Sequence, residues 1–196
     1  MRYYISDLHF FNNRLNHTFD NRGFKNANEM NKYMINQWNG RVRKNDEVVI
    51  VGDFSDEKWE KTYEILKKLN GKKFLIIGNH DKFIKDKNFD PHSFEWIKDY
   101  AELNDNKRKV ILCHYPLLSY NRQFSLDYNG TPKTYMLHGH THHSTEQELL
   151  QGFQQIIKRT KNKDKVYIPC NLINCFCVDS DYVPLTLDEW INKNTK

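Results

Sequence analysis

The chain alternates between segments with the hydrophobic periodicity of helices and short apolar runs that suit strands. In residues 27–39, Met30, Met34 and Trp38 lie four positions apart, which predicts an amphipathic helix with these side chains on one face. Further helices are expected over residues 57–69, 145–160 and 186–194, the first and last of them with Asp56 and Thr186 as candidate N-caps.

Apolar runs bounded by polar residues predict the strands, which we expect at residues 3–6, 47–51, 73–77, 134–137, 166–170 and 176–182. Residues 96–103 and 109–113 flank a polar segment and predict a hairpin. The order β-α-β-α-β, followed by mostly antiparallel strands, indicates a layered α/β fold with a mixed sheet or a sandwich of sheets.

Composition, charge and cysteine content narrow the class of protein. The 196 residues are 38% hydrophobic, which excludes a disordered chain and favours a single domain over residues 1–196. The apolar runs are far shorter than the ~18 residues of a membrane span. With no signal-peptide core, a cytoplasmic protein with reduced cysteines and no membrane partner is expected. The net charge of +5 supports only a weak attraction for anionic substrates.

Polar side chains that can bind metal follow five of the predicted strands, at the point where each strand ends. They are Asp7 and His9, Asp53, Asn79, His114, and the pair His140 and His142. In open α/β sheets, ligands bind outside the carboxyl ends of the strands. Five such ends could therefore converge on one pocket.

The chemistry of this set favours two metal ions. Carboxylate, amide and imidazole ligands without thiolate suit divalent ions such as Mn²⁺, Fe²⁺, Zn²⁺ or Ni²⁺. Seven ligands are too many for one catalytic ion and suit a pair of ions about 3.5–4 Å apart. Each motif alone has an ordinary structural interpretation as a turn, a cap or a buried histidine. The complete set, in order and after successive strands, is specific.

The order D-x-H, G-D-x-x-D, G-N-H-D, H, G-H-x-H resembles the calcineurin-like metallophosphoesterase superfamily, and the opening "SDLHF" is similar to its small bacterial and phage members. The resemblance implies a four-layer α/β/β/α sandwich with mixed sheets. It also implies two ions. By this resemblance, the first would be held by Asp7, His9, Asp53 and His142, and the second by Asp53, Asn79, His114 and His140. His138 and His143 fall outside the motif, and we expect them to support the site or lie on the surface.

The resemblance also assigns the catalytic groups. His80 would be the acid that protonates the leaving oxygen, with Asp56 as its hydrogen-bond partner; Asp56 as a helix N-cap is the alternative. A hydroxide that bridges the ions would be the nucleophile. Asp81 is expected to brace the loop, and Tyr115 to line the pocket.

Substrate recognition is less well defined by the sequence. Protein phosphatases of this superfamily carry Arg-Gly after G-D-x-x-D, and "GDFSDEK" lacks it. Arg14 and Arg22 are the candidates to bind phosphate, although a surface arginine is the simpler interpretation of Arg22. "FNNR" replaces a histidine that related members carry after the opening motif. Specificity is expected in loops 10–27, 82–96 and 119–131.

The favoured function is hydrolysis of a small phosphorylated or nucleotide-like substrate, with phosphodiesters preferred over monoesters and Mn²⁺ as the favoured metal. A non-catalytic metal-binding scaffold is an alternative, against which the presence of His80 counts. A nuclease is a minor alternative, because no basic stripe typical of nucleic-acid binding is visible. The helix at 145–160 is expected to be a surface helix, with a lid or an oligomer contact as alternatives.

Overall fold

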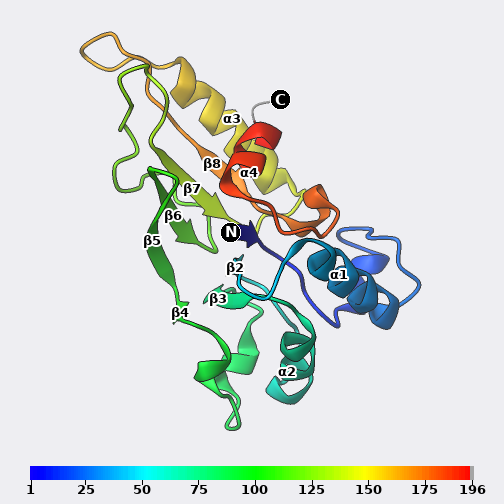
Figure 1. Cartoon of the computed structure of the whole chain (residues 1–196). Helices are drawn as coiled ribbons and strands as arrows, with labels where there is room; N and C mark the ends of the chain where they lie inside the picture. The colour runs from blue at the N-terminus through cyan, green and yellow to red at the C-terminus, as the bar shows by residue number, and fades with distance from the viewer. Residues whose placement is uncertain (195–196) are drawn as a thin grey trace.

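A computed structural model describes residues 1–194 and shows two four-stranded sheets with helices outside them (Figure 1). The first sheet contains β1 (Arg2–Ile5), β2 (Glu47–Val51), β3 (Lys72–Ile76) and β4 (Ile97–Lys98), all parallel to their neighbours. The second contains β5 (Tyr100–Asp105), β6 (Arg108–Cys113), β7 (Thr134–His138) and β8 (Leu172–Asn174). The helices are α1 (Ala27–Arg41), α2 (Trp59–Lys68), α3 (Thr145–Arg159) and α4 (Leu187–Asn194).

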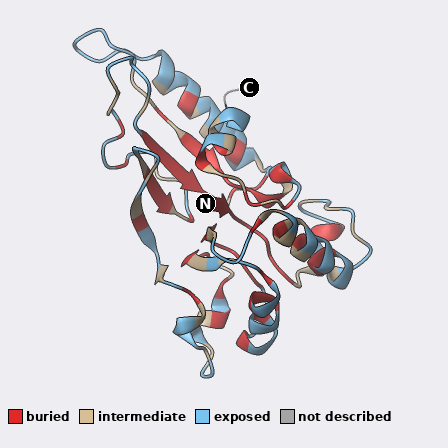
Figure 2. Ribbon diagram, in the orientation of Figure 1, coloured by how far each residue is buried: buried red, intermediate tan, exposed pale blue. Residues whose placement is uncertain are grey.

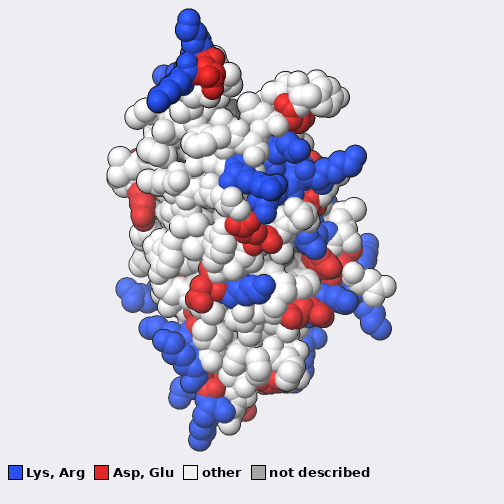
Figure 3. Space-filling model, turned by 90° about the vertical axis from the view of Figure 1, so that its left-hand side faces the viewer, with Lys and Arg blue, Asp and Glu red and all other residues white. Residues whose placement is uncertain are grey.

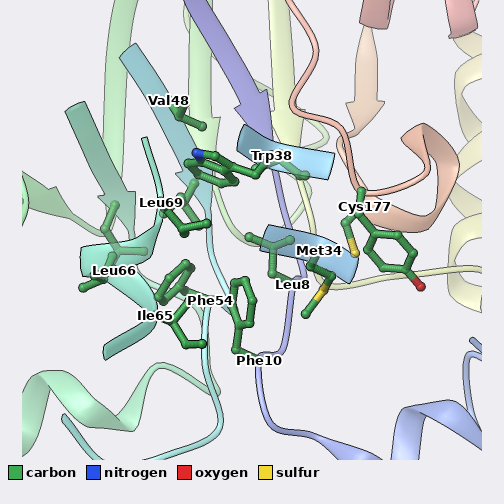
Figure 4. Packing of buried hydrophobic residues seen from close by; sticks show 14 of the residues in the cluster. Leu8, Phe10, Met34, Trp38, Val48, Phe54, Ile65, Leu66, Leu69 and Cys177 are labelled. Atoms are coloured by element: carbon green, nitrogen blue, oxygen red, sulfur yellow. The ribbon is translucent and has the colours of Figure 1, made fainter. Parts of the chain in front are cut away.

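The two faces of the first sheet enter different hydrophobic clusters, as strand alternation requires. In β1, Tyr3 and Ile5 pack with residues of α1 and α2, whereas Tyr4 points to the opposite face. On the helix side, Met34 and Trp38 of α1 are buried against this sheet (Figure 4). The spacing that predicted this helix therefore identifies the face that packs on the sheet.

The second sheet alternates in the same way. In β6, Val110 and Leu112 share a cluster with Tyr4 of the first sheet, so the two sheets pack face to face. Ile111 lies on the other face, in a cluster against which Phe153 of α3 packs. The layers are thus α1 and α2, the first sheet, the second sheet, and α3, which confirms the predicted α/β/β/α sandwich. The strands at its centre are largely buried (Figure 2).

Three sequence-based expectations about the strands are wrong. The second sheet is not mostly antiparallel: β5 and β6 form the expected hairpin, but β6, β7 and β8 are parallel. The first arm of the hairpin, expected over 96–103, is also shorter, because Ile97–Lys98 pairs with β3 in the first sheet as β4. Residues 166–170 contribute only an isolated bridge between Lys161 and Tyr167, because Pro169 lacks the N–H that a strand ladder needs. The last strand instead begins at Leu172.

The expected strand at 176–182 is the short 3-10 helix η4 (Cys177–Ser180). Asp181 and Tyr182 follow it with positive φ angles of 51° and 61°, so the chain turns where the apolar pattern predicted extension. Polar turn-forming residues within "VDSDY" outweigh the apolar residues around them. The helix expected over 57–69 is shorter than predicted and begins at Trp59.

The other helices follow the pattern closely. Thr186 and Glu189 bond each other's backbone N–H groups at the start of α4, which is a capping box. Helix α3 packs on the outer face of the second sheet through Phe153 and Ile157, in agreement with a surface helix. No helix within residues 1–194 is both long enough and apolar enough to cross a bilayer.

Candidate metal centre

Two neighbouring turns at the carboxyl ends of β1 and β2 form the floor of the site. The backbone N–H of Asp7 donates to the carbonyl of Gly52 at 3.0 Å, and that of His9 donates to the carbonyl of Asp53 at 2.9 Å. Asp7, His9 and Asp53 have positive φ angles of 56°, 49° and 53°. Left-handed backbone is uncommon for residues other than glycine and often marks functional sites. These turns aim three potential ligands toward one point.

The first group of ligand atoms contains Asp7, His9, Asp53 and His142. The Nε2 atom of His9 lies 3.3 Å from Nε2 of His142 and 3.4 Å from Oδ2 of Asp53. Nε2 of His142 lies 3.4 Å from Oδ1 of Asp7. Ligands bonded at ~2.0–2.2 Å to one ion are separated by roughly 3.0–3.6 Å from each other. The spacing of these atoms is therefore that of a coordination shell.

The second group lies beside the first and shares Asp53 with it. His114 Nε2 lies 3.3 Å from Asp53 Oδ2 and 3.1 Å from Asn79 Oδ1. His140 Nδ1 lies 3.0 Å from the same Asn79 oxygen. The structure thus brings together all seven residues that the sequence proposed as ligands. Asp53 contributes to both groups, the position that a carboxylate bridging two ions would occupy.

Two observations show that the groups suit cations. Asp7 is fully buried, and its Oδ2 atom has no hydrogen-bond partner. The Nδ1 atoms of His9 and His142 are each held by a carboxylate, of Asp56 at 2.8 Å and of Asp20 at 2.6 Å. A histidine that donates from Nδ1 directs the lone pair of Nε2 at its ligand. Two such nitrogens 3.3 Å apart suit a divalent ion between them.

The charges of the site reinforce each other in the metal-free chain. Burial lowers the pKa of His142, but hydrogen bonds to Asp20 and Asp7 outweigh burial and raise it to about 9. Burial also opposes the charged form of His114, and the bond to Asp53 raises its pKa to about 9. Conversely, burial raises the pKa of Asp7, and the nearby histidines bring it well below its usual value. The pKa of Asp53 is likewise lowered: burial raises it, and the hydrogen bond to His114 outweighs burial. The ligand carboxylates Asp7 and Asp53 are therefore ionised at neutral pH and able to bind cations.

His80 lies at the edge of this cluster, with its side chain 43% exposed. Its Nδ1 atom bonds to Oδ1 of Asp56 at 2.6 Å, while Oδ2 of Asp56 accepts from Nδ1 of His9 at 2.8 Å. The expected contact between Asp56 and His80 is present. The alternative role of Asp56 as a helix cap is wrong, because α2 begins after Lys58 and has no side-chain cap. One carboxylate thus orients two histidines.

Asp81 braces the loops beneath the ligands, as expected. Its carboxylate accepts hydrogen bonds from the backbone N–H groups of Asp53, Phe54 and Gly78 at 2.7–2.9 Å. Asp53 Oδ1 in turn accepts from the backbone N–H of His80 at 2.8 Å. The turn after β2 and the turn after β3 are therefore held together by two carboxylates.

A pocket of about 280 Å³ opens over the two ligand groups. Its lining residues are His9, Asn12, Arg14, Leu15, Thr18, Phe19, Asp53, Asn79, His80, His140 and His142. Of the loops in which specificity was expected, 10–27 supplies one wall. The lining contains no residue of 82–96 or 119–131, as far as residues 1–194 show.

The three candidate substrate-binding residues lie in different places. Arg14 lines the pocket. Tyr115 packs its ring on His140, 4.5 Å between centroids, and is 47% exposed. Arg22 lies elsewhere: its side chain is completely buried and bonded to Asp20 and to the carbonyls of Asp7 and Leu8. Neither surface exposure nor direct contact with phosphate fits that position.

The histidine-rich segment 138–143 separates into distinct roles. His140 and His142 are in the ligand groups, whereas His138 is buried and bonds the carbonyl of Gly139. Burial lowers the pKa of His138 to about 4, so it is neutral. His143 is exposed and bonds Asp179 at 2.7 Å. Asp20, which holds His142, was not found from the sequence, because no motif marks it.

The chain matches the calcineurin-like phosphoesterase family over residues 3–166 and therefore belongs to it. An uncharacterized protein of Methanocaldococcus jannaschii is 37% identical over 146 residues, which cover 71% of this chain and 68% of that protein. A protein of unknown function from Aquifex aeolicus, solved by crystallography, is similar in fold with a TM-score of 0.64 at 20% identity. That match covers 99% of this chain and 98% of the other.

Proposed function

We propose that this protein is a dinuclear metal-dependent phosphoesterase that hydrolyses phosphodiesters in preference to monoesters. The observation that carries the proposal is the shared position of Asp53 between two groups of ligand atoms, with His80 beside them. Two divalent ions, when bound, would lower the pKa of water and neutralise charge on the phosphoryl group. A site of seven converging ligands next to an exposed histidine has no evident structural purpose.

His80 is proposed to protonate the leaving oxygen. Its Nδ1 atom is engaged by Asp56, so Nε2 is the ring nitrogen available for proton transfer. The side chain lines the pocket over the ligand groups and is 43% exposed, so a substrate held there could meet it. Retention of this histidine supports an enzyme over a non-catalytic scaffold.

The preference for diesters rests on the charge available in the pocket. Arg14 is the one arginine or lysine that lines it within residues 1–194. A monoester dianion carries more charge than a diester, and its additional oxygens call for additional cationic donors. A pocket of about 280 Å³ suits a small phosphorylated or nucleotide-like substrate.

We favour Mn²⁺ as the native metal, while Fe²⁺, Zn²⁺ and Ni²⁺ suit the same nitrogen and oxygen ligands. A cytoplasmic location is also proposed, and the four cysteines, which are all free, support a reducing compartment. A nuclease is not favoured. On the face shown in Figure 3, Lys and Arg are interspersed with Asp and Glu rather than gathered into one basic stripe.

The test is an assay of metal-stripped protein on bis-p-nitrophenyl phosphate and p-nitrophenyl phosphate, with Mn²⁺ added back. We expect Mn²⁺-dependent turnover that is faster on the diester. His80→Ala should reduce it by about 10²–10⁴-fold. The matched control is His92→Ala, which alters an exposed histidine of the 3-10 helix η3 (Pro91–Ser93) and should leave turnover unchanged.

Turnover that is faster on the monoester would contradict the diester preference alone. Turnover that His80→Ala leaves intact would contradict the role of His80. Two bound ions without turnover on either ester, for each of the four metals, would favour the scaffold alternative.

A further inference from the structure

Arg22 and Asp20 form a buried ion pair directly beneath the first ligand group. Their side chains are 0% and 2% exposed, and Nη2 of Arg22 lies 2.8 Å from Oδ2 of Asp20. Both residues belong to the irregular segment between η1 (Asn13–Asn16) and α1. Burying two charges in a loop is costly unless each is paired and hydrogen-bonded. The contacts of this pair account for its position.

The Arg22 guanidinium holds the turn that carries Asp7 and His9. Its Nη2 atom donates to the carbonyl of Asp7 at 2.9 Å, and its Nη1 atom donates to the carbonyl of Leu8 at 2.8 Å. This is the stretch in which Asp7 and His9 adopt positive φ angles. Two donors on consecutive carbonyls fix the peptide planes of that turn. The directions of both side chains follow from those planes.

Asp20 extends the same network to His142. Oδ2 of Asp20 accepts from Nε of Arg22 at 2.9 Å, and Oδ1 bonds Nδ1 of His142 at 2.6 Å. The His142 ring is also packed against Phe176, 4.6 Å between centroids. A carboxylate on Nδ1 fixes the tautomer and the orientation of a histidine whose Nε2 binds metal.

We propose that Arg22 and Asp20 are positioning residues for the first metal ion, which link the Asp7–His9 turn to His142 through one buried ion pair. Three of the four ligands of the first group are thereby linked to one ion pair: the Asp7–His9 turn through Arg22, and His142 through Asp20. The second group is held mainly by other contacts: His114 Nδ1 bonds the carbonyl of Val51 at 3.0 Å, and Asp81 braces the turn that precedes Asn79 and His80. One hydrogen bond joins the two groups, from the backbone N–H of His140 to Oδ1 of Asp7 at 2.9 Å. The proposal therefore predicts a selective effect on one ion.

Asp20→Asn is the first variant. An amide has one oxygen where the carboxylate has two, so it accepts from His142 or from Arg22 but not from both. If it accepts from Arg22, its NH₂ group faces Nδ1 of His142 and favours the tautomer with a proton on Nε2. Either arrangement weakens binding of the first ion and raises its Kd by about 10–100-fold. The matched control is Asp179→Asn, which alters an Asp–His contact outside the ligand set, to His143 at 2.7 Å.

The measurement is calorimetric titration of the metal-free chain with Mn²⁺. Asn79→Ala and His142→Ala assign the two binding steps, because each removes a ligand of one group only. We expect Asp20→Asn to weaken the step that His142→Ala abolishes and to leave the other nearly unchanged. In the His142→Ala background, Asp20→Asn should leave the remaining step, that of the second ion, unchanged, which a general loss of stability would not reproduce.

An unchanged Kd, equal weakening of both steps, or weaker binding of the second ion when Asp20→Asn is added to His142→Ala would overturn the proposal. If Asp20→Asn does not fold, Arg22→Gln takes its place, since Gln keeps a donor but loses the ion pair. Failure of both variants to fold would show a role in folding instead. The proposal rests on the ligand assignment and not on hydrolysis: two bound ions without turnover would refute the enzyme alone, whereas a wild-type chain that binds no Mn²⁺ would refute both.

Discussion

Asp56→Asn tests how one carboxylate serves two histidines. Oδ1 of Asp56 bonds His80 at 2.6 Å, and Oδ2 bonds His9 at 2.8 Å, so both oxygens accept. The histidine contacts also bring the pKa of Asp56 to about 2, although burial alone would raise it, so Asp56 is ionised at neutral pH. An amide can accept from only one of the two. The variant therefore disturbs either the proposed acid or a ligand of the first ion.

The magnitudes follow from these two roles. Loss of an oriented acid costs about 10²–10⁴-fold in kcat, or roughly 3–5 kcal/mol of transition-state stabilisation. Loss of a carboxylate behind a metal-binding histidine costs about 10–100-fold in metal affinity. His80→Ala should show the first loss alone. Asp56→Asn should show either loss or both, depending on which histidine its oxygen retains.

The assay measures kcat on bis-p-nitrophenyl phosphate across a Mn²⁺ titration, for the wild type and both variants. Asp90→Asn is the control, because Asp90 accepts only local backbone bonds at η3 in the described structure. A wild-type kcat together with a wild-type Mn²⁺ dependence in Asp56→Asn would refute the reasoning. So would weaker Mn²⁺ binding in His80→Ala, since that variant leaves the proposed ligands in place.

Three further predictions concern the metal and its surroundings. Removal of metal by a chelator should lower Tm. Mn²⁺ at about 100 times its Kd should restore about 2.7 kcal/mol of the free energy of unfolding, measurable by calorimetry. An unchanged Tm would contradict a metal site that exists only in the folded protein. Mn²⁺ affinity should rise between about pH 6 and pH 9 and then level off, because His114 and His142 must lose protons to bind the metal. Burial lowers the pKa of both histidines, but their carboxylate partners outweigh burial and raise it to about 9. Titration with Mn²⁺ at several pH values checks this, and a flat profile would contradict it. Gly52→Ala should weaken binding of the second ion, since a Cβ there collides with the imidazole of His114 and the φ of +88° disfavours any L side chain. Gly130→Ala, at φ +80° with no atom within 4 Å of its Cβ, controls for backbone strain.

The local pattern of apolar and polar residues was sufficient to predict most of the helices and strands. The four-residue spacing of Met30, Met34 and Trp38 follows from the geometry of a single helix and needs no knowledge of its partners. The same is true of β2, whose apolar run is buried on both faces of the sheet. The pattern failed at residues 166–182, where Pro169 and the "VDSDY" turn override apolar content.

Some residues of the candidate site could likewise be predicted from the sequence, and others could not. Ligand-type residues at the ends of successive strands were visible in the sequence because a strand end is a local feature, and parallel strands bring such ends to one edge. Asp20 has no such signature: it lies in an irregular loop and meets His142 across 122 positions of sequence. Arg22 could be placed on the surface or against substrate from its type alone, and only its buried contacts exclude both.

The sequence by itself therefore determined the family, the sandwich of sheets and the chemical types gathered at the strand ends. Tertiary structure alone decided that Asp56 orients two histidines and does not cap α2, and that Arg22 supports the Asp7–His9 turn from behind. The physical reason is the distance along the chain over which each effect acts. Helical and strand periodicity act within a few residues, whereas the partner of a buried charge is set by how distant loops pack, and only pairing makes that burial tolerable.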